Sequence, residues 1–170
     1  MFHRILVGVD DSTASRAALA KAIELVQAGR GRLGLLSSAP PPPPLAGAGP
    51  IVLPVSRREL ERQLLEWAQR NVEEAARLVP NDVPITKLVT RGAPGAALLR
   101  EARTGCWDLV VVGQGHRRPR VPLLERVGDR LNRRSPTPVL VVHEEPDSAA
   151  MAPRRAGWFA RKRRARVAAA

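Results

Sequence analysis

Short apolar runs alternate with helix-like stretches along most of the sequence, and this alternation restricts the fold more than any other feature. The apolar runs predict buried strands over 5–9, 32–38, 83–89, 109–112 and 138–142. Between them, apolar residues at helical spacing predict helices over 13–27, 56–78, 94–103 and around 123–131. Strands that alternate with helices form a parallel sheet through right-handed crossovers, covered on both faces. The sequence therefore predicts an α/β domain.

The first predicted helix carries signals at both ends. Asp10, Asp11 and Ser12 supply N-cap chemistry, and the helix needs only one of them. Gly29 and Gly31 are expected to end it.

The second predicted helix follows a proline-rich segment. Residues 39–54 include five consecutive prolines and predict an exposed, partly polyproline loop. Ser56 and Glu59 then fit a capping box, in which each side chain satisfies a free backbone N–H. One face of this helix is expected to carry Leu60, Leu64, Trp67, Ala68, Asn71, Val72, Ala75 and Leu78.

The formal net charge of +12 is concentrated toward the C-terminus. Residues 146–170 carry seven basic residues against one acid, which gives half of the total. We expect a domain over 1–145 and a basic, disordered tail over 146–170. Aromatic residues beside the basic cluster, Trp158 and Phe159, leave open a tail that attaches to nucleic acid or to an anionic membrane.

Cys106 is the single cysteine, which excludes an intrachain disulfide and a multi-cysteine metal site. Beside Trp107, it is interpreted as a small buried hydrophobic residue. The three histidines have no cysteine or carboxylate companion at helical spacing, so no metal site is expected. Neither a secretory signal nor an apolar run of about 18 residues occurs, and a cytoplasmic location is expected.

Three segments in the same order as in a known family give the sequence a resemblance. Residues 5–19, 108–113 and 135–142 are similar to the corresponding segments of the universal stress protein family. The resemblance covers about residues 2–143, and Gly92 stands where the family often has glycine.

The resemblance implies a five-stranded parallel sheet of order 3-2-1-4-5, Rossmann-like and similar to the adenine nucleotide alpha hydrolase-like folds. It places Asp10 beside Gly113 where the strand order reverses. It implies ATP or AMP as a possible ligand. It also implies a homodimer through the last strand, formed here by Val139, Leu140, Val141 and Val142.

The phosphate-binding motif of the family is only partly present. The family pattern is Gly-x-x-Gly, nine residues, then Gly-Ser or Gly-Thr, because glycine lets backbone N–H groups approach phosphate. Gly113 matches the first glycine, but His116 occupies the second position. The Gly-Ser position falls on Glu125 and Arg126, or on Arg126 and Val127, depending on the direction of counting. Gly115 and Gly128 are present but off register.

The predicted ligand site follows from these positions, and its residues are Val9, Asp10, Val112, Gly113, Gly115, His116, Arg126 and Val127. Two alternatives stay open at this point. Asp10 either contacts a ribose or adenine edge or only caps the helix. The arginines of the loop 113–122 either bind an anion or form a solvated basic surface.

Three functions remain open from the sequence. The first is a stress-response regulator that binds ATP or AMP at the switch point, and the second is a dimeric interaction module of the same fold without nucleotide. The third is attachment to nucleic acid or to an anionic membrane through the basic tail. No nucleophile and base pair is recognisable, so an enzyme is not expected, although slow ATP hydrolysis stays open. Glu125 and Asp129 are interpreted as part of a salt-bridged surface.

Overall fold

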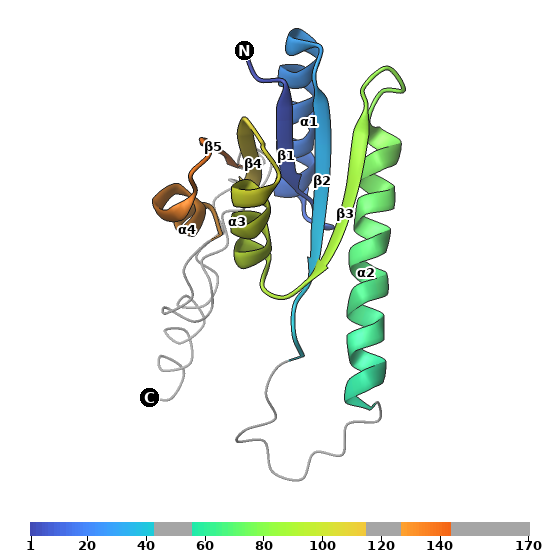
Figure 1. The fold of residues 1–170 in the computed structure, drawn as a ribbon. Coiled ribbons are helices and arrows are strands. Elements are labelled where there is room, and N and C mark those ends of the chain that lie inside the picture. The colour runs from blue at the N-terminus through green and yellow to red at the C-terminus, as the bar shows by residue number, and fades with distance from the viewer. Residues whose placement is uncertain (43–55, 115–126, 144–170) are drawn as a thin grey trace, which may run out of the picture.

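The computed structural model describes residues 1–42, 56–114 and 127–143. It contains a single five-stranded parallel sheet with helices between the strands (Figure 1). The strands are β1 (Arg4–Gly8), β2 (Arg32–Ala39), β3 (Ile85–Arg91), β4 (Leu109–Gln114) and β5 (Val139–His143). The helices are α1 (Thr13–Gly29), α2 (Arg57–Leu78), α3 (Pro94–Thr104) and α4 (Val127–Arg134). The predicted α/β class and element order are confirmed.

The order of the strands is β3-β2-β1-β4-β5, as the resemblance implied. β1 lies at the centre and pairs with both β2 and β4, with Val7 opposite Val111. The chain therefore leaves β1 toward β2 on one side, and returns on the other side as β4. In such sheets the carboxyl ends of the two central strands diverge and leave a crevice.

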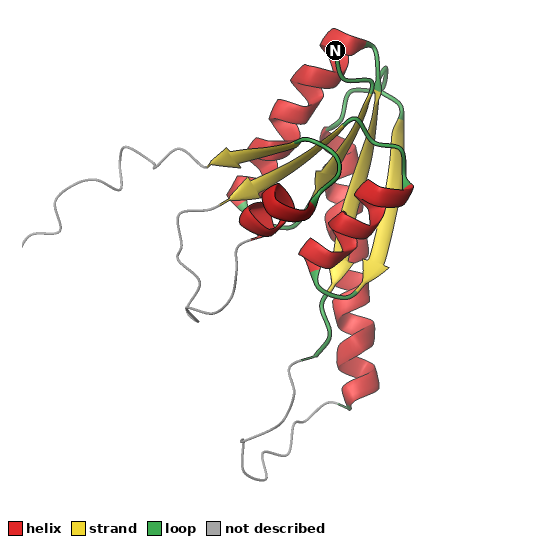
Figure 2. Ribbon diagram, turned by 60° about the vertical axis from the view of Figure 1, so that its left-hand side comes forward, coloured by secondary structure: helices red, strands yellow, loops and turns green. Residues whose placement is uncertain are grey.

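Helices cover both faces of the sheet (Figure 2). Alternate residues of β1 point to opposite faces, so Ile5 and Val7 pack with α1 and α2, whereas Leu6 packs with α3. Both cores are fully buried at β1. Burial on both faces explains why the strand reads as a continuous apolar run rather than as an alternating one.

We expected glycine to end α1 by adopting a left-handed backbone conformation, but the structure differs. The left-handed residue is Arg30, with φ of 50°. Glycine is needed at positions 29 and 31 for another reason. A methyl group at Gly29 would collide with the carbonyl oxygen of Phe2, and one at Gly31 with that of His3. Both glycines permit close packing against the residues that lead into β1.

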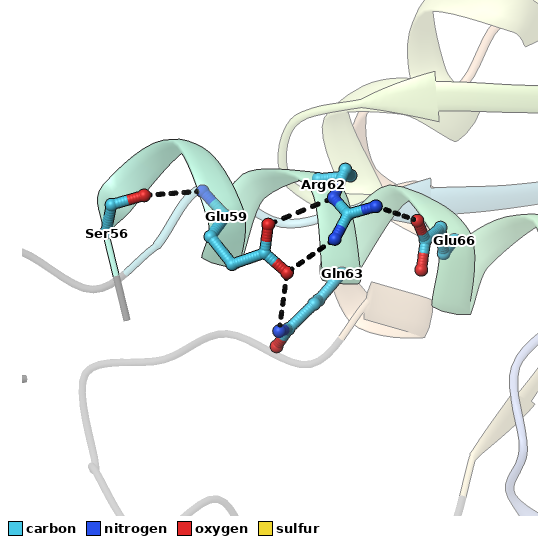
Figure 3. Close-up of polar contacts among 5 residues, drawn as sticks. All are labelled: Ser56, Glu59, Arg62, Gln63 and Glu66. Atoms are coloured by element: carbon cyan, nitrogen blue, oxygen red, sulfur yellow. Dashed lines mark hydrogen bonds and ion pairs between the residues drawn. The ribbon is translucent and has the colours of Figure 1, made fainter. Parts of the chain in front are cut away.

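The start of α2 contains half of the predicted capping box (Figure 3). Ser56 Oγ accepts a hydrogen bond from the backbone N–H of Glu59 at 3.1 Å, as predicted. The Glu59 carboxylate does not reach back, and instead accepts hydrogen bonds from Arg62 and Gln63, while Arg62 also pairs with Glu66. The Arg62 guanidinium, followed by Gln63, lowers the pKa of the Glu59 carboxyl. The reciprocal contact was predicted wrongly because a neighbouring arginine competes for the same carboxylate.

The apolar face of α2 is buried only where the helix lies over the sheet. Ala68, Asn71, Val72 and Ala75 are buried, as predicted. Leu78 is 59% exposed, contrary to the prediction, and borders a groove between α1 and α2 instead of the core. Helical spacing predicts the face of α2 on which a side chain lies. It does not predict how far along the helix that face is covered by the sheet and α1.

The strand boundaries shift by one or two residues from the prediction. β3 begins at Ile85 because Val83 and Pro84 form the preceding turn, although Val83 is buried there. β4 does not end at Gly113 but continues through Gln114, since both residues pair with the end of β5.

The turn between α3 and β4 holds Cys106 in a left-handed conformation with φ of 54°. Its side chain is exposed, so the interpretation of Cys106 as a buried hydrophobic residue is wrong. The reason is local, because the turn directs this side chain outward while Trp107 folds over Gly34 of β2.

Several predictions concern residues that the structure does not describe. The proline-rich loop is described only through Pro42, and the tail, Glu125 and the residues around Leu123 and Leu124 lie outside the described ranges. Within those ranges, no helix combines the length and hydropathy needed to cross a membrane.

Candidate functional site

A cavity of about 100 Å³ lies where the carboxyl ends of β1, β2 and β4 meet. Its lining also includes residues of α1, α2, α3 and α4. It is lined by Gly8, Val9, Asp10, Ser15, Leu36, Ser37, Ser38, Trp67, Pro94, Leu98, Val112, Gly113 and Val127. This is the switch point of the sheet, where open α/β proteins bind ligands.

The structure brings together the predicted site residues that it describes. Val9, Asp10, Val112, Gly113 and Val127 all line the cavity. The other three predicted residues, Gly115, His116 and Arg126, lie outside the described residues.

Asp10 lies just after the end of β1 and is held there by a local hydrogen-bond network. Its Oδ1 accepts from the backbone N–H of Ser12 at 2.9 Å and from the Ser12 hydroxyl at 2.5 Å. Its own N–H donates to Ser15 Oγ at 2.9 Å. Ser12 is the N-cap of α1, because its Oγ accepts from the N–H of Ser15. These hydrogen bonds fix Asp10 in position, although Ser12 and not Asp10 is the helix cap. The Asp10 side chain is exposed.

The second carboxylate oxygen of Asp10, Oδ2, has no hydrogen-bond partner among the described residues. The residue is exposed and borders the cavity. Oδ2 is available to accept a hydrogen bond from a ligand hydroxyl or amine.

Gly113 is required by packing as well as by its position at the cavity. A methyl group at this position would collide with the carbonyl oxygen of Ala14 and lie 2.6 Å from the backbone nitrogen of Ser15. The first turn of α1 therefore rests directly on the end of β4. Glycine at this position brings the start of α1 and the end of β4 to the same cavity.

Two adjacent serines at the end of β2 were not among the predicted site residues. Ser37 and Ser38 are 2% and 4% exposed and border the cavity. Ser38 Oγ donates to the carbonyl oxygen of Gly92 at 2.6 Å, and Gly92 has a φ of 114° that favours glycine. The sequence did contain a signal, since two hydroxyl residues end an otherwise apolar strand. The sequence did not show that this strand end lies against the cavity.

Trp67 of α2 was also missed, because its helical spacing assigned it to the packing face of the helix. It borders the cavity and is only partly buried. Its indole N–H points to Asp11 Oδ2 at 3.5 Å, which joins α2 to the loop between β1 and α1.

A larger groove of about 370 Å³ adjoins the cavity and shares Val9, Asp10 and Ser15 with it. The groove separates α1, which packs over β4, β5 and β1, from α2, which packs over β2 and β3. Arg16 and Arg77 line it together with acidic residues, so its charges are mixed.

The chemistry of the cavity is that of a binding site for a partly polar ligand. Valine and leucine side chains, serine hydroxyls and one carboxylate surround it. The part of the chain that the structure describes contains no group of three or more histidine, cysteine or acidic residues arranged to hold a metal ion.

The parallel sheet, its strand order and the cavity at the reversal point define a doubly wound α/β protein with a cavity at its switch point. The model of the universal stress protein family matches residues 1–143. The chain therefore belongs to the universal stress protein family.

Solved structures with the same fold come from this family. Universal stress protein UspA from Lactobacillus plantarum is 19% identical, with 82% of this chain and 97% of that chain covered and a TM-score of 0.61. A universal stress protein in complex with cAMP is 26% identical, with 84% and 97% covered and a TM-score of 0.53. A family protein from Arabidopsis thaliana with AMP bound is 18% identical, with 87% and 98% covered and a TM-score of 0.51. No protein of curated function matches the sequence.

Proposed function

We propose that the protein is a stress-response regulator whose switch-point cavity binds the nucleoside part of ATP or AMP. The observation that carries the proposal is the meeting of Asp10, which follows β1, and Gly113 of β4 at one cavity where the Asp10 side chain is exposed. Related proteins with cAMP and with AMP bound support the choice of an adenine nucleotide.

The size of the cavity limits what part of the ligand it holds. Its volume of about 100 Å³ is below the ~300–1,000 Å³ of ordinary small-molecule pockets. The cavity therefore takes a base or a ribose, and the phosphates lie outside it. Asp10 Oδ2 accepts from a ribose hydroxyl or from an exocyclic amine. On the sequence alone, we assign Gly115, His116 and Arg126 to the phosphate side.

Binding to the intact chain tests the proposal. We expect ATP or AMP, with magnesium present, to bind at micromolar concentration in isothermal titration. Asp10→Asn keeps the Oδ1 contact with Ser12 but turns the free oxygen into an amide nitrogen. A hydrogen bond to a charged group contributes about 1.5–3 kcal/mol, so the affinity should fall about 12- to 140-fold.

Two controls separate this site from the basic charge of the chain. Asp82→Asn removes one charge in the exposed turn after α2 and should bind like wild type. Inorganic tripolyphosphate measures attraction to phosphate without a nucleoside. If ATP and AMP bind no better than tripolyphosphate, the adenine nucleotide proposal is wrong.

The proposal also covers the location of the protein, its class and the boundary of its domain. We propose a cytoplasmic binding protein rather than an enzyme. We further propose a family domain that ends near residue 145, followed by an added basic segment over 146–170.

A second candidate function is a dimeric interaction module that works without nucleotide. The observation that favours it is the position of β5, which has β4 as its one neighbour in the described sheet. Val139, Leu140, Val141 and Val142 are only partly buried there. A dimer together with no nucleotide binding in the titration above would select this function.

A further inference from the structure

Trp67 is a large aromatic side chain whose packing is incomplete. The next residue of α2, Ala68, is fully buried, whereas Trp67 is partly exposed at the border of the cavity. Its indole N–H lies 3.5 Å from Asp11 Oδ2, a long distance that directs the ring without tying it tightly. A tryptophan in this position leaves apolar ring surface beside a cavity that also has polar groups.

The packing of α2 fixes the position of the Trp67 backbone relative to the end of β2. Asn71 lies one turn further along the same face of α2 and is 5% exposed. Its Nδ2 donates to Ser37 Oγ at 3.5 Å, and Ser37 itself lines the cavity. Val72, 1% exposed, anchors the same turn in the core. Two turns of α2 are therefore docked on the end of β2, and the distance between Trp67 and the serines is set by packing.

We propose that Trp67 stacks on a planar aromatic ring of the ligand and selects nucleosides over phosphate compounds that lack a base. This inference rests on the proposed function, which it extends by assigning the base to the α2 side of the cavity. On this side Trp67 supplies the ring surface, while Ser37 and Ser38 supply hydroxyls to the same cavity. The ribose then lies toward Asp10, on the side of β1.

Stacking of a base on an aromatic side chain contributes about 1–3 kcal/mol, measured by its loss on substitution. This corresponds to about a 5- to 140-fold change in affinity. Stacking depends on the flat face of the ring and not on its hydrogen-bonding edge. Replacement of tryptophan by another aromatic residue should therefore preserve much of the affinity, whereas an aliphatic residue of similar bulk should not.

The test compares Trp67→Phe with Trp67→Leu in the full-length protein, with AMP as the probe. Phenylalanine and leucine fill similar space, but only phenylalanine offers an aromatic face. We expect Trp67→Leu to bind AMP about 5- to 140-fold more weakly than wild type, and Trp67→Phe to lose clearly less. Trp107→Phe is the matched control, because Trp107 covers Gly34 of β2 and does not line the cavity.

A probe without a base and a spectroscopic signal complete the experiment. Ribose 5-phosphate should compete for the site with the same affinity in wild type and in Trp67→Leu. In the Trp107→Phe protein AMP should change the tryptophan fluorescence, and this change should disappear when Trp67→Phe is added. Far-ultraviolet circular dichroism and the melting temperature establish that each variant is folded.

The possible failures are distinguishable. Equal AMP affinities for Trp67→Leu and Trp67→Phe would overturn the stacking role while the proposed function stands. Equal losses of AMP and of ribose 5-phosphate affinity in Trp67→Leu would show a structural role instead and would also overturn it. Absence of AMP and ATP binding in the wild-type protein would overturn the proposed function and this inference together.

Discussion

Gly113 serves packing at a position where family resemblance suggests phosphate binding. The carbonyl oxygen of Ala14 occupies the space that a methyl group at Gly113 would need. This constraint exists in the protein without a ligand. Glycine at position 113 is therefore needed for the packing of α1 against β4, independently of any phosphate binding by the loop after it.

Substitution of Gly113 by alanine is expected to destabilise the fold. A methyl group forced against backbone atoms costs about 1–3 kcal/mol, because the start of α1 or the end of β4 must shift. The free energy of unfolding, measured by urea titration, should fall by that amount.

Gly95→Ala is the matched control, since the nearest atom to its methyl group would be Arg130 Cδ at 3.5 Å. Gly95 lies in the first turn of α3, where alanine is the better helix former. This variant should be neutral or more stable by up to about 1 kcal/mol. A Gly113→Ala protein as stable as Gly95→Ala would contradict the packing argument.

At the scale of an element, α1 and α2 begin with the same chemistry in different surroundings. Ser12 and Ser56 each accept a hydrogen bond from the backbone N–H three residues later. Ala14 and Ser15 are buried in the first turn of α1, whereas no residue of α2 before Ala68 is buried. In Figure 1 the start of α2 extends beyond the ends of the strands.

The two caps should consequently differ in what they stabilise. Ser12→Ala is expected to lower the global free energy of unfolding by about 1 kcal/mol, because the first turn of α1 unfolds only with the core. Ser56→Ala should mainly increase the amide hydrogen exchange of the first turn of α2, with little change in global stability. Equal effects of the two variants on the urea midpoint would show that the start of α2 is coupled to the core.

At the scale of the whole molecule, Asp108 links the turn before β4 to the start of β1, the neighbouring strand at the centre of the sheet. Its Oδ2 accepts hydrogen bonds from the backbone N–H groups of His3 and Arg4, each at 2.9 Å. These two contacts, the one from His3 first, hold the pKa of the Asp108 carboxyl below its usual range. The turn before β4 is thereby fastened to the start of β1.

The lowered pKa predicts a pH dependence of stability. The folded protein binds the proton of Asp108 less readily than the unfolded chain, so its contribution is complete above the unfolded pKa of about 4 and is lost as the pH falls below it. Asp108→Asn should cost about 1 kcal/mol at pH 7, because the group is exposed and its charge is screened.

The comparison is made by urea unfolding between pH 7 and pH 3. The difference between wild type and Asp108→Asn should shrink at the acid end, while Asp82→Asn controls for the loss of one charge. A difference that stays constant with pH would mean that the carboxylate charge does not matter for this contact.

Within the described ranges, β5 has β4 as its one neighbour, so the edge of the sheet at β5 supports the expected homodimer. Pairing of two β5 strands would cover the partly buried valines and give partners to backbone groups that have none among the described strands. Val142→Lys puts a charge at this edge and should shift a dimer toward monomer in light scattering after size-exclusion chromatography. A monomeric wild-type protein at high micromolar concentration would contradict the dimer.

The sequence by itself determined the alternation of strands and helices, the parallel sheet and the N-cap at Ser56. These features depend on local patterns, such as apolar periodicity and the spacing between a cap and the third residue after it. The strand order was enough to predict that Asp10 lies beside Gly113, because the order fixes which strand ends are neighbours.

Only the tertiary structure decided which side chains surround the cavity from other elements. Trp67 and Leu78 share a helical face in the sequence, yet one borders the cavity and the other a groove, since their surroundings depend on where the sheet ends. Ser37 and Ser38 became site residues because β2 lies next to β1. Contacts between residues far apart in the chain depend on register and layer spacing, which no local pattern records.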